Sequence, residues 1–318
     1  MIMAAGVGSR LMPMTAEVPK PMISLCNRPL MENSLRLLQR HGFDQVVANL
    51  HYLGQAISDY FGNGEDFGIE LCYSHEKELW GTAGGVKRCA AFLDETFVVL
   101  SGDALTDIDL SALLRRHRRA GALASIALKP VEAVEEFGVV VLDAGERIKS
   151  FQEKPPRSEA LSDLVNTGIY IFEPEIFEHI PAGEFYDFGL QVFPALIECG
   201  APFYGFGIDD YWCDVGSLDT YRQAHDDILT GRVRVQPQGE VIASPWGRLL
   251  AGEGVRLGHE VVVKGSACVG AGSTIGEGVI LENAVIWENS VIGPGAEIRD
   301  AIIGSGCHIG AQAVVGAW

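Results

Sequence analysis

Residues 1–22 hold the densest set of groups that could bind phosphate. Residues 1–9 read Met-Ile-Met-Ala-Ala-Gly-Val-Gly-Ser, an apolar run that enters a glycine-rich loop. Such a loop lets backbone N–H groups approach phosphate oxygens closely. Arg10 adds a planar fork of donors and Lys20 adds a mobile ammonium, and both groups suit a polyphosphate. The segment therefore predicts a binding site for phosphate groups.

Spacing separates this segment from two common phosphate loops. A dinucleotide-binding fingerprint would need a third glycine where Leu11 stands, and a Walker A loop would need Gly-Lys-Ser/Thr beginning there. The bland alternative is a glycine-rich turn flanked by surface cations. A lone Gly-x-Gly is a weak signal, but the whole segment, with Arg10, Pro13, Thr15 and Pro19-Lys20-Pro21, resembles the opening of a known enzyme family, which favours a dedicated site over that alternative.

Two aspartates further along the chain could hold a divalent cation. Asp103 follows the apolar run 97–100 in Ser101-Gly102-Asp103, and Asp214 stands in a turn-rich stretch over 211–216. Mg²⁺ prefers one or two carboxylates together with water and phosphate oxygens. Either aspartate alone is more often a cap or turn residue. Together with the phosphate loop, the pair predicts a magnesium site.

The elements that must position these groups follow a β-α-β rhythm up to about residue 128. Hydrophobic spacing predicts helices over 29–39, 53–61 and 109–120, and strands over 45–50, 69–74, 97–100 and 123–128. This alternation indicates an α/β fold with a doubly wound, Rossmann-like sheet. Ligands of such sheets bind outside the carboxyl ends of the strands. Residues 6–10 and 101–103 both fall at such ends.

Later segments interrupt that rhythm. Residues 139–142 and 148–151 flank a turn signal and predict an antiparallel hairpin, and 166–172 predicts another strand. Further helices are expected over 176–180, 189–199 and 218–229. We expect these elements to complete a catalytic domain over residues 1–232.

A six-residue repeat marks a second domain over residues 233–318. From 269 to 315 an aliphatic or aromatic residue recurs every six positions, slipping twice to five. Such a period stacks inward-pointing side chains in successive coils. The pattern resembles the left-handed parallel β-helix of hexapeptide-repeat proteins. We expect Trp287 to point outward, and the repeat runs to Trp318 without a polar cap, so we expect a homo-oligomer joined through residues 250–318.

Composition limits the possible partners. The chain has 318 residues and a formal net charge of −18, which argues against binding of nucleic acid or of an anionic membrane. No apolar run approaches the roughly 20 residues of a membrane span, and no signal peptide is visible. We expect a soluble, cytoplasmic protein. Its seven cysteines lack any Cys-x-x-Cys, so neither a disulfide framework nor a zinc cluster is indicated.

Over residues 1 to about 232 the chain resembles the sugar-1-phosphate nucleotidyltransferases. The resemblance rests on the opening loop, on Pro19-Lys20-Pro21-Met22, Gly102-Asp103, Glu153-Lys154-Pro155, Asn166-Thr167-Gly168, and Trp212-Cys213-Asp214-Val215-Gly216. It implies that Asp103 and Asp214 bind Mg²⁺ and that Arg10, Lys20, Asp103 and Lys154 are catalytic. The implied nucleotide site comprises Ala4, Ala5, Gly6, Gly8, Ser9, Arg10, Lys20, Gly81, Thr82, Gly84 and Gly102. The implied sugar-phosphate site comprises Gly138, Glu153, Lys154, Asn166, Thr167 and Gly168.

The resemblance also implies an activity. The motifs are most similar to those of bacterial mannose-1-phosphate guanylyltransferases, which implies GTP and mannose 1-phosphate as substrates and GDP-mannose and pyrophosphate as products. Uridylyl or thymidylyl transfer to glucose 1-phosphate, or to a related sugar phosphate, is the alternative within the family. A non-catalytic subunit that binds a nucleotide-sugar is the alternative of another class, and the complete set of charged motif residues disfavours it. An acyltransferase acting through the β-helix lacks a plausible catalytic histidine.

Overall fold

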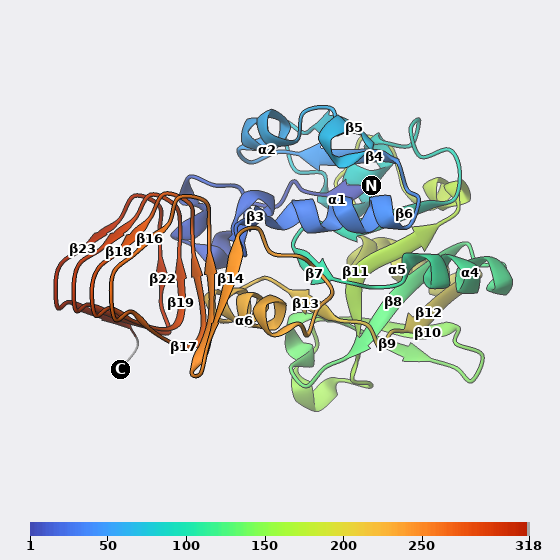
Figure 1. Cartoon of the computed structure of the whole chain (residues 1–318). Helices are drawn as coiled ribbons and strands as arrows, with labels where there is room; N and C mark the ends of the chain where they lie inside the picture. The colour runs from blue at the N-terminus through green and yellow to red at the C-terminus, as the bar shows by residue number, and fades with distance from the viewer. Residues whose placement is uncertain (317–318) are drawn as a thin grey trace. The chain divides into compact units, whose positions relative to one another are not determined.

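The computed structural model describes residues 1–316, which form two compact units (Figure 1). Unit 1 comprises residues 1–7, 18–21 and 34–214. Unit 2 comprises residues 8–17, 22–33 and the chain from Val215 onward. The expectation of an uncapped coil end at Trp318 concerns a residue outside the described range.

Unit 1 is built on one mixed sheet of nine strands. Its parallel part comprises β6 (Phe97–Ser101), β1 (Ile2–Met3), β4 (Gln45–Leu50) and β5 (Glu70–His75), in that spatial order. Residues 97–100 of β6 are buried, as expected for a strand covered on both faces. The helices of this unit include α2 (Gly54–Phe61), α3 (Gly81–Arg88), α4 (Leu110–Ala120) and α5 (Phe193–Glu198). α1 (Leu30–Arg40) has residues in both units. The expected Rossmann-like rhythm is confirmed.

Antiparallel strands extend the sheet beyond β6. β11 (Leu164–Phe172) pairs with β6, and the hairpin of β9 (Gly138–Leu142) and β10 (Ile148–Glu153) pairs with β11 through β9. β8 (Ala124–Pro130) pairs with β11 on one side and with β12 (Phe203–Gly207) on the other. The pattern did not predict β12, because two of its five residues are glycines and the strand is stabilised by parallel pairing with a distant partner.

Three local expectations for unit 1 were wrong in detail. Residues 212–214, expected within a turn, form the strand β13 (Trp212–Asp214), which pairs with β7 (Ala104–Thr106). The expected helix over 176–180 is a 3-10 helix over Pro174–His179. The helix expected from residue 189 begins as a π-helical turn over Phe188–Val192 before α5.

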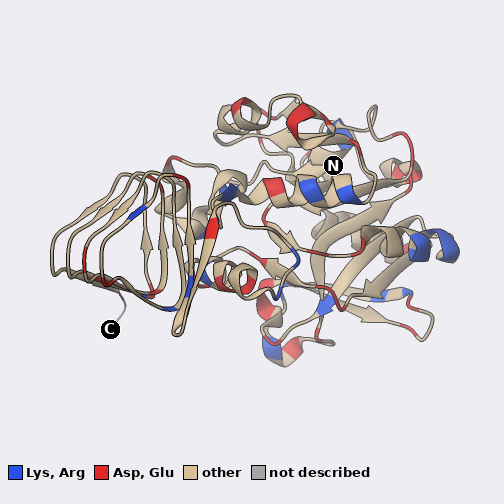
Figure 2. Ribbon diagram, viewed as in Figure 1, with Lys and Arg blue, Asp and Glu red and all other residues tan. Residues whose placement is uncertain are grey.

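Helix α4 contains the basic run Arg115-Arg116-His117-Arg118-Arg119. Asp109 caps its N-terminus by accepting a hydrogen bond from the Ala112 N–H, and Gly121 ends it in a left-handed conformation. Arg118 and Arg119 lie in its last turn, where cations interact favourably with the helix dipole. Figure 2 shows these basic residues at one end of α4. Their position is that of a solvated helix end.

Unit 2 contains the repeat as stacked parallel strands. One series comprises β15 (Gly247–Ala251), β17 (Val262–Val269), β19 (Ile280–Ile286), β21 (Glu297–Arg299) and β24 (Val314–Gly316), with β22 (Ile302–Ile303) also pairing with β19. A second series comprises β16 (Arg256–Leu257), β18 (Thr274–Ile275), β20 (Val291–Ile292) and β23 (His308–Ile309). β14 (Glu240–Ser244) pairs antiparallel with β15. Repeat residues such as Ile275, Leu281, Ile292 and Ile298 are buried in one core. The arrangement is consistent with the expected β-helix.

Trp287 corrects one expectation about this domain. The residue was expected to point outward, but it is 7% exposed and its Nε1 donates a hydrogen bond to the Tyr221 hydroxyl at 2.9 Å. Tyr221 belongs to helix α6 (Leu218–Thr230), which packs within unit 2. The large indole therefore covers the helix, and one of the two arguments for a homo-oligomer through residues 250–318 no longer holds. Among residues 1–316, no helix is long and apolar enough to cross a membrane.

Candidate active site

A pocket of about 270 Å³ lies in unit 1 at the carboxyl ends of the parallel strands. Its lining includes predicted nucleotide-site residues and one predicted metal ligand, namely Ala5, Gly6, Gly81, Thr82 and Asp103. No protein atom lies within 4 Å of the position that a Cβ on Gly6 would take, so a ligand can approach the backbone there. The exposed side chains of Leu79 and Phe185 add apolar walls.

Three charged residues from separate segments meet beside this pocket. Lys20 Nζ lies 2.6 Å from Asp103 Oδ2 and 3.7 Å from Asp214 Oδ1. The pairing of β7 with β13 sets Asp214 opposite Ala104, directly after Asp103. The structure thus brings together both predicted metal ligands and one predicted phosphate ligand.

The charge of Asp103 is stabilised by its neighbours. Burial by itself would raise the pKa of this carboxyl group, but the charge of Lys20 and hydrogen bonds from Lys20 and Ser101 outweigh that effect and lower it. Asp103 is therefore ionised at neutral pH. Two carboxylates that converge on one ammonium also fit a divalent cation, because Mg²⁺ takes carboxylate oxygens as ligands.

Sequence reasoning missed a polar pair beneath the phosphate loop. Asn49 Oδ1 accepts a hydrogen bond from the Ala4 N–H at 2.9 Å, and Asn49 Nδ2 donates to Glu76 Oε1 at 2.8 Å. Both side chains are buried and both residues line the pocket. The one available signal was an asparagine inside the otherwise apolar run 46–50. The pair fixes the backbone at the start of the loop.

Residues 81–85 form the first turns of α3. A Cβ on Gly81 would meet the Tyr186 carbonyl oxygen at 2.4 Å, and one on Gly84 would meet that of Glu184 at 2.9 Å. These glycines are therefore required for packing against residues 184–186. Thr82 Oγ1 donates a hydrogen bond to Asp187 Oδ2 at 2.8 Å.

Asp187 is a further pocket residue that the sequence motifs did not indicate. It lines the pocket, and its Oδ1 accepts hydrogen bonds from the N–H groups of Gly189 and Leu190. The Gly189 position is close to Glu153 as well, since a Cβ there would lie 2.6 Å from Glu153 Oε2. Asp187 thus lies between the predicted nucleotide and sugar segments.

The Glu153-Lys154 pair stands at the exposed end of β10. Lys154 has a φ of 47°, and its N–H donates a hydrogen bond to the Phe137 carbonyl at 3.1 Å. Partial burial raises the pKa of Glu153, Lys154 opposes this effect, and Asp187 adds to it. Both side chains are accessible to a ligand.

The Asn166-Thr167-Gly168 segment of β11 uses much of its polar capacity within the protein. Asn166 Nδ2 donates to the Tyr170 hydroxyl at 3.0 Å, and Thr167 Oγ1 donates to the Ala127 carbonyl at 2.7 Å. Thr167 is buried. Gly168 has a φ of 74°, and a Cβ there would lie 2.8 Å from Ser101 Cβ. The glycine lets β11 approach the strand that ends at Asp103.

Two other predicted glycines are also constrained by packing. A Cβ on Gly138 would lie 2.3 Å from Phe151 Cζ, and one on Gly102 would lie 2.6 Å from the Met3 carbonyl oxygen. The space beside Gly138 that was expected to admit the sugar is therefore filled by the Phe151 ring. Gly102 brings Asp103 close to β1, because its N–H donates a hydrogen bond to Met3 O at 2.9 Å.

The remaining predicted phosphate ligands, Gly8, Ser9 and Arg10, belong to unit 2. Gly8 has a left-handed conformation, with φ of 69°, and precedes a 3-10 helix over Ser9–Leu11. Thr15 Oγ1 donates a hydrogen bond to the Gly8 carbonyl at 2.8 Å. The Arg10 side chain is exposed.

Comparison with known proteins agrees with this fold. The chain belongs to the nucleotidyl transferase family, whose model matches residues 1–231. A second model, described as the GMPPB C-terminal domain, matches residues 246–317. The chain is an enzyme of the sugar-1-phosphate nucleotidyltransferase class, as the resemblance implied.

Individual relatives differ in the substrates that their names state. A UTP–glucose-1-phosphate uridylyltransferase of Synechocystis sp. is 39% identical, with 95% of this chain and 86% of the relative covered. A mannose-1-phosphate guanylyltransferase of Mycobacterium tuberculosis is 31% identical, with 87% of this chain and 76% of the relative covered. Among solved structures, a putative glucose-1-phosphate thymidylyltransferase from Bacillus anthracis matches with a TM-score of 0.65 at 22% identity, covering 75% of this chain and 96% of that one. The structural match concerns the fold.

Proposed function

We propose that this enzyme transfers the nucleotidyl group of a nucleoside triphosphate to a sugar 1-phosphate and releases pyrophosphate. The observation that carries the proposal is the convergence of Lys20, Asp103 and Asp214 beside the pocket at the strand ends. An oxygen of the sugar phosphate attacks the α-phosphorus, and the bond from that phosphorus to the bridging oxygen of pyrophosphate breaks. A phosphomonoester is largely a dianion at neutral pH, since its second pKa is about 6, so the attack needs no protein base.

In this proposal the protein positions the reactants and neutralises charge. Lys20 exchanges its carboxylate partners for oxygens of the departing pyrophosphate, and Arg10 binds the same triphosphate. Lys154, accessible at the end of β10, orients the phosphate of the sugar, while Glu153 and Asn166 bind its hydroxyls. Such preorganised charges are often the largest contribution to catalysis.

Asp103 and Asp214 would hold Mg²⁺. Their convergence on the Lys20 ammonium supports this assignment, because the same oxygens can face a cation of higher charge. When bound, the metal ion supplies positive charge to the phosphate oxygens. The low pKa of Asp103 keeps its oxygens available as ligands at neutral pH.

For the substrates we propose UTP and glucose 1-phosphate. The supporting observation is the 39% identity over 95% of this chain to the uridylyltransferase named above. GTP and mannose 1-phosphate are the second candidate, supported by the match of residues 246–317 to the GMPPB C-terminal domain and by the 31% identical guanylyltransferase. The sequence motifs favoured this second pair.

A substrate matrix tests the proposal. The full chain is assayed for pyrophosphate release with each of UTP, GTP, dTTP and ATP against glucose 1-phosphate and mannose 1-phosphate, with Mg²⁺ present. We expect the highest kcat/KM for UTP with glucose 1-phosphate. A higher value for GTP with mannose 1-phosphate would select the second candidate. Binding of a nucleotide-sugar without turnover of any pair would contradict the enzymatic proposal.

A further inference from the structure

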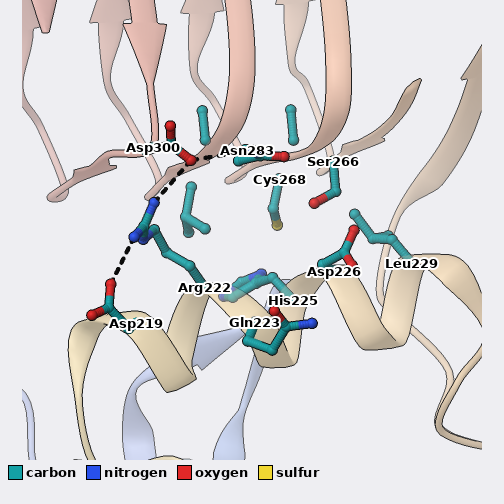
Figure 3. Close-up of a pocket in the computed structure, with 13 residues that line it drawn as sticks. Asp219, Arg222, Gln223, His225, Asp226, Leu229, Ser266, Cys268, Asn283 and Asp300 are labelled. Atoms are coloured by element: carbon teal, nitrogen blue, oxygen red, sulfur yellow. Dashed lines mark hydrogen bonds and ion pairs between the residues drawn. The ribbon is translucent and has the colours of Figure 1, made fainter. Parts of the chain in front are cut away.

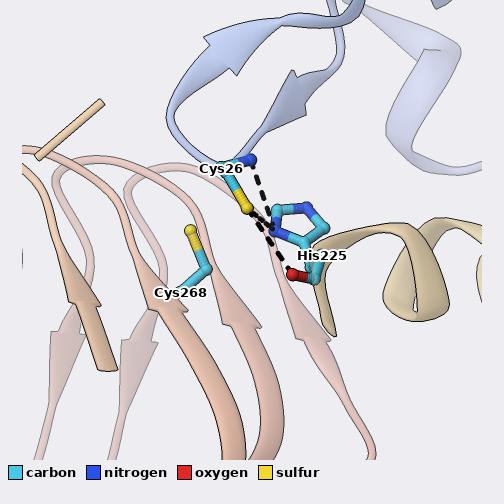
Figure 4. A group of neighbouring side chains, drawn as sticks. All are labelled: Cys26, His225 and Cys268. Atoms are coloured by element: carbon cyan, nitrogen blue, oxygen red, sulfur yellow. Dashed lines mark hydrogen bonds between the residues drawn. The ribbon is translucent and has the colours of Figure 1, made fainter. Parts of the chain in front are cut away.

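Three metal-ligating side chains lie together in unit 2, and none of them belongs to the candidate active site. Figure 4 shows Cys26, His225 and Cys268 facing one another. Their ligand atoms all lie within 4.8 Å of one another. All three residues are buried, with exposed fractions of 1%, 2% and 2%. None of them takes part in the proposed reaction.

Each residue is held by a different element. Cys26 and Asn27, with φ of 49° and 65°, form the turn between β2 (Ser24–Leu25) and β3 (Arg28–Pro29), a backbone typical of a tight hairpin. His225 lies on α6 and Cys268 on β17. Because 199 residues separate Cys26 from His225, no local spacing in the sequence could reveal the group.

We propose that Cys26, His225 and Cys268 form a zinc site. Zinc binds thiolate sulfur at about 2.3 Å and imidazole nitrogen at about 2.0–2.1 Å, which in a tetrahedral site sets sulfur and nitrogen about 3.6 Å apart. The distance from Cys26 Sγ to His225 Nδ1 is 3.5 Å. The Cys268 sulfur lies within 4.8 Å of both other ligand atoms, and two sulfurs of a tetrahedral zinc site lie about 3.8 Å apart, so zinc binding would draw Cys268 closer to the other two ligands.

Charge selects zinc over a monovalent ion. Two thiolates and a neutral imidazole carry a formal charge of −2, which Zn²⁺ neutralises and Cu⁺ does not. An uncompensated charge in a site this deeply buried is costly. The ligand set itself favours zinc or copper over magnesium or calcium, because thiolates are soft ligands.

The imidazole of His225 is oriented by the hairpin turn that carries Cys26. The Cys26 N–H donates a hydrogen bond to His225 Nδ1 at 3.3 Å, which directs this nitrogen toward Cys26. Zinc bound at Nδ1 would replace this hydrogen bond, because the nitrogen has a single lone pair.

A cavity of about 360 Å³ in unit 2 gives access to the group. Figure 3 shows His225 and Cys268 among the residues that line it. Asp219, Asp226 and Asp300 also line the cavity, with Arg222 paired to the first and last of them. The three carboxylates outnumber the single arginine of this lining, which favours cations there. In the proposed site a water molecule in this cavity would take the fourth position, as in zinc sites with three protein ligands.

Metal content of the full chain tests the proposal. Wild type, Cys268→Ser and the matched control Cys307→Ser are dialysed against Zn²⁺, passed through gel filtration and analysed by mass spectrometry for bound zinc. Cys307 is a partly buried cysteine that packs against the core of the stacked strands and lies outside the group. We expect one zinc per chain in wild type and control, and an affinity more than about tenfold weaker in Cys268→Ser. Equal zinc in Cys268→Ser, or essentially none in wild type, would overturn the proposal.

A second measurement on the wild type needs no variant to fold. Replacement of zinc by Co²⁺ should produce the thiolate-to-cobalt charge-transfer band of a cysteine-ligated site, and added zinc should remove it. The absence of that band would overturn the proposal. The proposal would also be overturned if the zinc-treated protein had an intact mass lower by two hydrogens and peptide mapping identified a disulfide between Cys26 and Cys268. Magnesium at the active site does not affect either readout, because it has no thiolate ligand.

Discussion

The Lys20, Asp103 and Asp214 group and the Cys26, His225 and Cys268 group contrast in almost every physical property. The first consists of charged groups whose side chains keep 9%, 31% and 18% of their surface exposed. The second consists of groups that can be neutral and are almost fully buried. Hard oxygen ligands open to solvent suit a site that exchanges substrates and Mg²⁺. Soft ligands in a closed core suit an ion that stays.

The two groups also differ in how their polar atoms are paired within the protein. In the first group the Lys20 ammonium offsets one of the two negative charges of Asp103 and Asp214, which lets these carboxylates lie close together. In the second group His225 Nε2 is buried without a hydrogen-bond partner among the described residues. A buried polar atom without a hydrogen-bond partner lowers the stability of the folded state. Packing around His225 and, in our proposal, the bound zinc offset this cost.

The largest expected effect comes from the aspartates. Asp103→Asn or Asp214→Asn should lower kcat by about 100–1000-fold, because each removes charge where the phosphates react. Pyrophosphate release measures the loss, circular dichroism checks folding, and the exposed Asp66→Asn is the control. Zinc content should be unchanged in both variants. Full activity in EDTA, or near-normal activity of Asp103→Asn, would remove the metal role from this group.

Substitution of the two lysines should separate the two substrates. Lys20→Ala should mainly weaken use of the nucleotide and Lys154→Ala use of the sugar phosphate, each by about 10–150-fold in kcat/KM if one charge-assisted hydrogen bond of about 1.5–3 kcal/mol is lost. Initial rates with each substrate varied in turn measure the division, and Lys149→Ala, an exposed lysine of β10, serves as control. Identical defects toward both substrates would contradict it.

Gly168→Ala should affect stability through the backbone beside Asp103. The change combines a left-handed conformation, costing about 1–2 kcal/mol, with a contact of 2.8 Å to Ser101 Cβ, costing a further 1–3 kcal/mol or so. Gly183→Ala is the matched control, since its φ is 78° but nothing lies within 4 Å of the added Cβ. Urea unfolding compares the two. Equal losses would show that β11 is not closely packed on β6 at this point.

The smallest expected effect concerns a second buried histidine, which differs from His225 in having partners on both nitrogens. His117 Nδ1 lies 2.8 Å from Ser125 Oγ and Nε2 lies 3.0 Å from Glu173 Oε1. Burial lowers the pKa of His117 below 6.5, although Glu173 partly opposes this. Below pH 6.5 this histidine is therefore protonated in the unfolded chain but still neutral in the folded chain. The free energy of unfolding falls as the pH falls, until the pH reaches the pKa of the folded state.

Urea unfolding of wild type and His117→Gln between pH 7.5 and pH 5 checks this effect. Each unit by which the native pKa is lowered corresponds to about 1.4 kcal/mol. The variant should be less stable at pH 7.5 and should lose less stability on acidification than wild type. Parallel pH profiles for the two proteins would show that His117 does not cause the loss.

Local sequence determined the class of the fold and much of the first charged group. Hydrophobic period separated strands such as 45–50 from helices such as 109–120, and the six-residue repeat indicated the coils of unit 2, because both patterns depend on residues only a few positions apart. The glycine-rich loop, Lys20, Asp103 and Asp214 were found because family motifs mark each of them along the chain. The structure then brought three of these together as expected.

Tertiary structure decided what no short segment encodes. Asn49 and Glu76 support the loop, Trp287 covers Tyr221, and Cys268 reaches Cys26 only because strands and helices from distant parts of the chain pack together. The sequence pattern around a tryptophan in a repeat is the same whether its side chain faces solvent or a helix. Likewise, cysteines that are far apart in the sequence give no sign of whether they are isolated or clustered in the fold. Side-chain periodicity fixes which face of an element is buried, but the partner of that face is set by long-range packing, whose separations in sequence carry no local signal.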